Sequence, residues 1–155
     1  MLNLSQGLRI RKRPEYLVCY EEGRRFASRS FMVFARVCPC DEPGFRFGMA
    51  VSKKVGSAVR RNRVKRLIRE FFRLRQVGIR EGVAKLSAVA GAPVCLEFVC
   101  VVKRNARPAH MDLAVVDEEL WPVVNKVVKT MGKRLGGDPA HRDVQGARRN
   151  QPSGN

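Results

Sequence analysis

Apolar residues recur at helical spacing in the middle of the chain. Numbered from Val64 at about 100° per residue, one arc holds Val64, Leu67, Ile68, Phe71, Phe72 and Leu74. Such an arc is typical of an amphipathic helix that packs one face on a core. Ser57 can cap this helix through its hydroxyl group, and Gly78 is expected to stop it after roughly Gln76.

Two patterns near the N-terminus predict a helix and a strand. Residues 14–23 are expected to form a short helix, because Pro14 suits a first turn and Gly23 suits a stop. Residues 30–37 alternate between two faces. We assign to the core the face made of Phe31, Val33, Ala35 and Val37.

The remaining elements follow from turn signals and apolar runs. Residues 41–44 read as a turn, so a second strand at residues 45–51 should form a hairpin with the first. Residues 79–93 are expected to be a loop with a short helix at best, and residues 94–102 a further strand. These elements are expected to belong to one domain over residues 1–135.

A last helix is expected to begin at Asp117. Its core stripe is Leu120, Val124, Val127, Val128, Met131 and Leu135. Pro122 is tolerable there only if it lies in the first turn or so, because proline lacks the backbone donor of a helix interior. Residues 136–155 are rich in Gly, Pro, polar and basic residues, which predicts a disordered basic tail.

The positive charge of the chain indicates that it binds a negatively charged partner. The formal net charge is +17. Half of the residues from Arg60 to Arg75 are Arg or Lys, and only Glu70 opposes them. Asn62, Arg66, Arg69 and Arg73 fall opposite the apolar arc and form a ridge roughly 16 Å long. Arg60 and Arg61 are expected at the helix N-terminus, where free backbone N–H groups also favour an anion.

A basic helix face is often simply solvated, so the ridge needs a further argument. A merely soluble helix interleaves both signs of charge, whereas this one stacks like charges at a cost of a few tenths of a kcal/mol per pair. A polyanion would offset that cost, and nucleic acid is the leading partner on charge. An anionic membrane surface is the competitor, but the apolar face of this helix is matched to a core.

Other features exclude several classes of site. Residues 1–13 lack the apolar segment of a secretory signal, and Glu97 interrupts the longest apolar region, so a cytoplasmic protein is expected. The five cysteines have no paired Cys-x-x-Cys spacing and no nearby histidine, so we expect no metal site. They are expected to be reduced and mostly buried, without a metal or redox role for the close pair Cys38 and Cys40. We assign no catalytic residue.

One extended motif carries a family resemblance. The run Phe47-Gly48-Met49-Ala50-Val51-Ser52-Lys53-Lys54-Val55-Gly56 is followed by Arg61-Asn62-Arg63-Val64-Lys65-Arg66-Leu67-Ile68-Arg69-Glu70. Together they resemble the bacterial ribonuclease P protein subunit. The resemblance implies a two-layer α-β sandwich with a central sheet and a left-handed βαβ crossover, against the usual right-handed rule.

The resemblance also implies a function. Such a protein is the partner of a catalytic RNA that removes the 5′ leader from precursor tRNA, with Mg²⁺ ions held in the RNA and no small-molecule substrate. Contacts to that RNA are implied for Arg60, Arg61, Asn62, Arg63, Lys65, Arg66 and Arg69. A cleft between the first helix and the sheet would hold the single-stranded leader, with Tyr16, Tyr20, Phe34, Arg36, Ser52, Lys53 and Lys54 as its contacts.

Two alternatives stay open at this stage. Without the resemblance, Tyr16 and Tyr20 are more simply read as core residues of a helix. A structural RNA-binding protein of ribosome-like type would share the charge but would need no cleft for a free strand. Dependence of binding on leader length distinguishes these two functions, whereas a membrane-surface protein would bind vesicles without preferring RNA.

Overall fold

A computed structural model describes residues 6–136 of the chain. The main elements are α1 (Arg13–Glu22), β1 (Arg24–Ala27), β2 (Phe31–Pro39), β3 (Gly44–Ala50), α2 (Ala58–Ala90), β4 (Val94–Val102) and α3 (Leu113–Gly136). Three short 3₁₀ turns, Gln6–Leu8, Lys53–Val55 and Pro108–His110, are named η1, η2 and η3. The predicted tail lies outside the described residues, apart from Gly136, which ends α3.

The sheet has the strand order β1-β2-β4-β3. Strands β1 and β2 are antiparallel, β2 and β4 are antiparallel, and β3 and β4 are parallel. The predicted hairpin of β2 and β3 is therefore wrong, because β4 lies between them. Of the nine residues of β4, seven are buried and all of these except Glu97 are apolar, as expected of a strand in the centre of a sheet.

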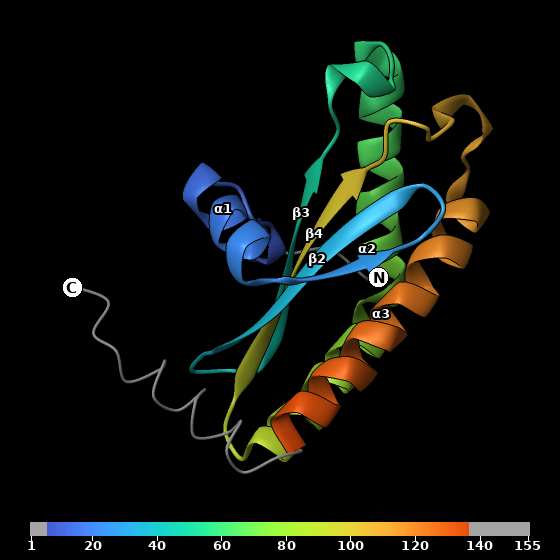
Figure 1. The fold of residues 1–155 in the computed structure, drawn as a ribbon. Helices are drawn as coiled ribbons and strands as arrows, with labels where there is room; N and C mark the ends of the chain where they lie inside the picture. The colour runs from blue at the N-terminus through green and yellow to red at the C-terminus, as the bar shows by residue number, and fades with distance from the viewer. Residues whose placement is uncertain (1–5, 137–155) are drawn as a thin grey trace.

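The connection from β3 through α2 to β4 has the unusual hand. Figure 1 shows both strands pointing upwards, with β4 to the right of β3 and α2 passing behind the sheet. A right-handed crossover with its helix on that side would place β4 to the left. The left-handed crossover implied by the resemblance is confirmed.

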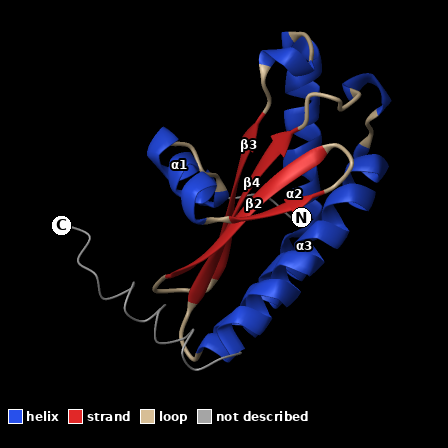
Figure 2. Ribbon diagram, in the orientation of Figure 1, coloured by secondary structure: helices blue, strands red, loops and turns tan. Residues whose placement is uncertain are grey.

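The helices lie on both faces of the sheet. Helices α2 and α3 cover one face, and the shorter α1 lies across the other (Figure 2). The main core lies between the sheet and the α2–α3 pair, and it includes the predicted strand residues Phe31, Val33 and Ala35. Phe72 lies at its centre, with its ring 4.2 Å from that of Phe47. A smaller cluster of Ile10, Cys19 and Val99 lies beneath α1.

Helix α2 is much longer than its sequence predicts. It continues through the region expected to be a loop and ends at Gly91, which adopts the left-handed conformation with φ 74°. Gly78 does not stop the helix. Its lack of a side chain serves packing instead, since a Cβ atom there would lie 2.7 Å from the Trp121 ring. Gly82 faces Val128 in the same way, so both glycines allow α2 and α3 to pack closely. Leu74, predicted to be core, is 45% exposed.

Helix α3 begins earlier than predicted. Asp112 accepts a hydrogen bond from the backbone N–H of Val115 at 2.9 Å and so caps the first turn. Pro122 is therefore well inside the helix, against the prediction that it lies near the first turn. Its ring is exposed, while Leu120, Val123 and Val124 beside it are buried, and their packing holds the helix across the missing hydrogen bond.

Candidate nucleic-acid interface

The N-terminus of α2 is where the sequence motif becomes a surface. Ser57 caps the helix as predicted, because its Oγ accepts a hydrogen bond from the backbone N–H of Arg60 at 3.3 Å. Arg60 and Arg61 therefore lie in the first turn, and Arg61 Nε donates to the Gly56 carbonyl at 3.2 Å. This turn combines two guanidinium groups with the positive end of a 33-residue helix.

A row of unpaired polar side chains follows along the helix. Arg60, Asn62 and Arg66 are exposed, and Lys65 is half-buried. Within residues 6–136, none of these four side chains has a hydrogen-bond or ion-pair partner. Their charge is therefore available to a ligand. This confirms that the row faces solvent but does not by itself identify what it binds.

Arg69 extends this row toward a residue that the sequence analysis did not select. Burial lowers the pKa of the Arg69 guanidinium, and the nearby positive charges of Arg9 and Arg66 lower that pKa further. Arg9 is held there because its segment runs beside β3, with the Ile10 N–H donating to the Phe47 carbonyl at 2.7 Å. No sequence spacing indicated that contact. The positive charges of Arg9, Arg66 and Arg69 therefore lie near one another on this surface.

Three arginines of the same helix are engaged within the fold instead. Arg63 donates to the Pro108 carbonyl at 2.9 Å, so η3 holds part of its guanidinium group. Arg73 forms an ion pair with Glu70, so the unpaired part of the predicted ridge ends at Arg69. Arg75 pairs with Asp117 at 2.7 Å and lies 4.4 Å from the centre of the Trp121 ring.

A second feature is a hollow of about 350 Å³ along α1. It is lined by Arg11, Arg13, Tyr16, Leu17 and Tyr20. The Tyr16 hydroxyl accepts a hydrogen bond from the Met49 N–H at 3.1 Å and lies 3.2 Å from the Met49 carbonyl, to which it donates. Gly48 allows this approach, because a Cβ atom there would lie 2.7 Å from the Tyr16 hydroxyl.

Tyr20 and Phe34 meet beside this hollow. Their ring centres are 4.9 Å apart in an edge-to-face arrangement, and the Arg25 guanidinium lies 5.7 Å from the centre of Phe34. Burial raises the pKa of Tyr20, and neighbouring Tyr16 raises it further. Both tyrosines pack against the cluster beneath α1 and also line the hollow. The simpler expectation of core packing is therefore confirmed in part, whereas the residues that line the hollow include none from the sheet, and the leader cleft stays a prediction.

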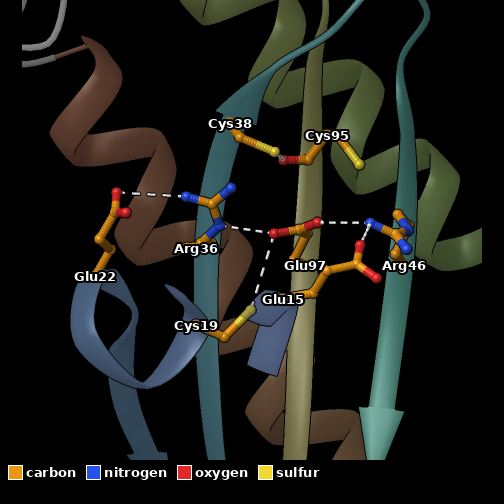
Figure 3. Close-up of polar contacts among 8 residues, drawn as sticks. All are labelled: Glu15, Cys19, Glu22, Arg36, Cys38, Arg46, Cys95 and Glu97. Carbon is orange, nitrogen blue, oxygen red and sulfur yellow. Dashed lines mark hydrogen bonds and ion pairs between the residues drawn. The ribbon is translucent and has the colours of Figure 1, made fainter. Parts of the chain in front are cut away.

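Arg36 is engaged in an ionic network under α1 (Figure 3). Its Nε donates to Glu97 at 2.6 Å, and its other end lies 3.4 Å from Glu22. Arg46 lies 3.2 Å from the second oxygen of Glu97 and 2.5 Å from Glu15, whose pKa it lowers. This network ties α1 to β2, β4 and β3. Sequence reasoning missed it because Glu97 lies alone in an apolar strand.

The remaining predicted leader contacts are not among the residues that line the hollow. Ser52, Lys53 and Lys54 are exposed and stand in and just before η2, ahead of α2. The structure therefore brings Tyr16, Tyr20 and Phe34 together, while it places Arg36 in the network and the two lysines near the basic end of α2.

Comparison with known proteins decides the family. The model of the family described as Ribonuclease P matches residues 4–128. A ribonuclease P protein component from Desulfovibrio desulfuricans is 42% identical over 81% of this chain and 87% of its own. One from Geobacillus kaustophilus is 32% identical over 89% of this chain and 98% of its own. The chain belongs to the ribonuclease P protein family.

Solved ribonuclease P proteins share its fold. That of Thermotoga maritima is 28% identical with a TM-score of 0.59, covering 76% of this chain and 96% of that one. That of Staphylococcus aureus is 26% identical with a TM-score of 0.59, covering 77% and 94%. The α/β fold implied by the motif is therefore confirmed, and the chain is similar to a component of an endoribonuclease complex.

Two features are absent from residues 6–136 of this ribonuclease P family member. None of the described helices is long and apolar enough to cross a membrane. The same residues contain no group of three or more His, Cys, Asp or Glu side chains that could hold a metal ion.

Proposed function

We propose that this chain is the protein subunit of a ribonuclease P ribonucleoprotein. In this proposal it binds the catalytic RNA and the single-stranded 5′ leader of precursor tRNA, and so promotes endonucleolytic 5′ maturation of tRNA. The observation that carries the proposal is the row of unpaired polar side chains at the N-terminal end of α2, joined by Arg9 from a distant segment. A folded RNA offers phosphates at the spacing such a row can follow.

The catalytic RNA is assigned to the N-terminal half of α2. Arg60, Asn62, Lys65 and Arg66 supply free donors, and Asn62 adds a neutral donor and acceptor that suits a 2′-hydroxyl group. Arg61 and Arg63 keep N–H groups beyond those used by Gly56 and Pro108, since a guanidinium has five. Contacts of this kind predict an affinity that falls steeply with salt.

The leader is assigned to the hollow along α1. Tyr16 and Tyr20 present aromatic surface there, and Arg11 and Arg13 provide positive charge for phosphates. Stacking on an aromatic ring tolerates any base, which suits a protein that must accept many precursors. Lys53 and Lys54 would then lie between the two surfaces along the chain. The bond cleavage itself is assigned to Mg²⁺ ions held by the RNA, with no catalytic residue in this chain.

Reconstitution tests the proposal. A bacterial ribonuclease P RNA and a labelled precursor tRNA are combined at low Mg²⁺ with and without the protein, and 5′ cleavage is measured. The proposal expects the protein to stimulate cleavage and to increase affinity for leader-bearing precursor over mature tRNA. Absence of stimulation would refute it, and binding that does not depend on leader length would favour a structural RNA-binding role.

The Tyr20→Ala variant tests the leader site separately. Loss of one stacking contact should lower precursor affinity by about 1–3 kcal/mol, or roughly 5- to 150-fold, and leave mature tRNA affinity unchanged. Tyr16→Phe is the matched variant, because it keeps the ring and removes the hydrogen bonds to Met49. Equal losses for precursor and mature tRNA would assign Tyr20 to the core alone.

A further inference from the structure

Two cysteines that are distant in sequence lie opposite each other on adjacent strands of the sheet. Cys38 on β2 is the register partner of Cys95 on β4. Both are partly exposed, whereas Cys19 and Cys100 are buried. The prediction that the cysteines are mostly buried is therefore wrong for Cys38, Cys40 and Cys95. The neighbour that sequence spacing suggested for Cys38 was Cys40, but strand pairing places Cys95 directly opposite it.

The backbone hydrogen bonds fix what kind of pair this is. The Cys40 N–H donates to the Pro93 carbonyl at 3.3 Å, so residues 40 and 93 form a hydrogen-bonded pair. Such pairs alternate along an antiparallel ladder, so Cys38 and Cys95 are also a hydrogen-bonded pair, with Cα atoms about 5.5 Å apart. That distance between Cα atoms lies within the range found in disulfides. The Cβ atoms of such pairs, however, lie roughly 1 Å further apart than in a relaxed disulfide.

The two thiols are also chemically different. The Cys38 thiol donates to the Cys95 carbonyl at 3.6 Å. The proximity of the two residues lowers the pKa of Cys38 against the opposing effect of burial, and it raises the pKa of Cys95. The lowered pKa of Cys38 agrees with a role for this thiol as the first nucleophile, and single variants test that order. In Figure 3 the Cys38 sulfur is directed at Cys95, whose own sulfur is turned away, so closure needs a rotation about χ1 of Cys95.

We propose that Cys38 and Cys95 form a thiol–disulfide exchange site for low-molecular-weight disulfides of the glutathione class. The Cys38 thiolate attacks one sulfur of the small disulfide, forming a mixed disulfide and releasing one thiol. Cys95 then loses its proton and attacks the Cys38 sulfur, which releases the second thiol and leaves a cross-strand disulfide. Two cysteine thiols are oxidised and one small disulfide is reduced to two thiols, so the step balances.

The position of the bond gives it two consequences. The cross-link joins β2 to β4 and encloses the whole of β3 and α2, so it restricts the unfolded chain over a long loop. It also lies beside the next pair on the same face, Arg36 and Glu97, which anchors α1. Because the Cβ spacing is wide, the bond is strained and readily reduced, as expected for a reversible modification rather than a structural disulfide.

The test uses the full-length protein with oxidised glutathione as the probe. Reduced protein is equilibrated across a range of glutathione ratios, quenched by alkylation, and analysed by intact mass and peptide mapping. The proposal expects loss of two hydrogens per molecule, a peptide that links Cys38 to Cys95, and full reversal by reduced glutathione. The oxidised form should unfold at a higher urea concentration than the reduced form.

Single variants identify the order of attack. Cys95→Ser should stop at a stable glutathione adduct on Cys38, whereas Cys38→Ser should react much more slowly at Cys95. Cys40→Ser is the matched control, since Cys40 is also partly exposed and stands two residues from Cys38, and it should oxidise like the unaltered protein. A wild-type cross-link that includes Cys40, or persistent glutathione adducts with no cross-link, would overturn the assignment without requiring any variant to fold.

Discussion

Replacing Arg66 with alanine tests whether the exposed row on α2 meets RNA phosphates. Arg66 is exposed and has no partner among residues 6–136, so its removal costs the folded protein little. A lost charge-assisted contact should weaken binding to ribonuclease P RNA by about 1.5 kcal/mol at low salt, or roughly tenfold. The magnitude of the slope of log affinity against log salt should decrease by about 0.7–0.9, because one fewer phosphate contact releases its counterions.

The salt dependence makes this prediction specific. A slope change of about 0.8 means that the deficit of the variant shrinks roughly threefold between 50 and 200 mM salt. Filter binding at four or five salt concentrations measures both quantities from the same titrations. Arg73→Ala is the matched control, because it removes an arginine from the same helix whose charge is already paired with Glu70. Equal slopes for Arg66→Ala and the unaltered protein, or equal changes in both variants, would refute the reasoning.

Three further predictions concern the fold that presents these surfaces. Glu97→Ala should lower the free energy of unfolding by about 3 kcal/mol, measured by urea unfolding, because it leaves Arg36 and Arg46 without their shared buried carboxylate. The control Glu22→Ala, at the exposed edge of the network, should lower it by under about 0.5 kcal/mol. Gly78→Ala should lower the free energy of unfolding by about 1–3 kcal/mol, because the added Cβ atom would collide with Trp121 on α3, whereas Gly132→Ala has room for a Cβ atom and should raise it by roughly 0.5–1 kcal/mol. A loss of stability in both variants would refute the packing argument. Because Arg75 lowers the pKa of Asp117, the unfolded state binds the Asp117 proton first on acidification, and the stability that this ion pair contributes is present above about pH 4 and is lost as the pH falls further. Asp117→Asn should therefore flatten the decrease of the urea midpoint at acid pH, and an unchanged decrease would contradict this.

Sequence periodicity predicted the elements whose signals are local. The apolar arc of α2 is confirmed at Val64, Ile68, Phe71 and Phe72, and the Ser57 cap is confirmed by its hydrogen bond. The alternation of β2 correctly separated its two faces. Each of these features depends on neighbours within a few residues, so the chain states them directly.

Predictions failed where tertiary contacts decide the local structure. Gly78 is a reasonable helix stop by propensity, yet its missing side chain serves close packing against Trp121 on α3. The turn at residues 41–44 does reverse the chain, but it does not reveal that a later strand separates β2 from β3. The crossover hand came only from the family resemblance, and the sheet order was not predicted, because no short-range pattern encodes either one.

The candidate site divides along the same line. Arg60, Asn62 and Arg66 follow from helical spacing alone, because one helix face carries them. Arg9 joins them only because the segment before α1 runs beside β3, and Arg36 is diverted because a glutamate 61 residues away lies opposite it. Spacing within one element therefore predicts which side chains share a surface, but long-range pairing decides which of their charges remain free. Beyond Arg69, Glu70 pairs with Arg73 and Asp117 pairs with Arg75, whereas Arg80 lies over the Phe45 ring. The densest unpaired charge among the described residues of α2 therefore coincides with the positive end of the helix dipole, to which the proposed RNA contact is assigned.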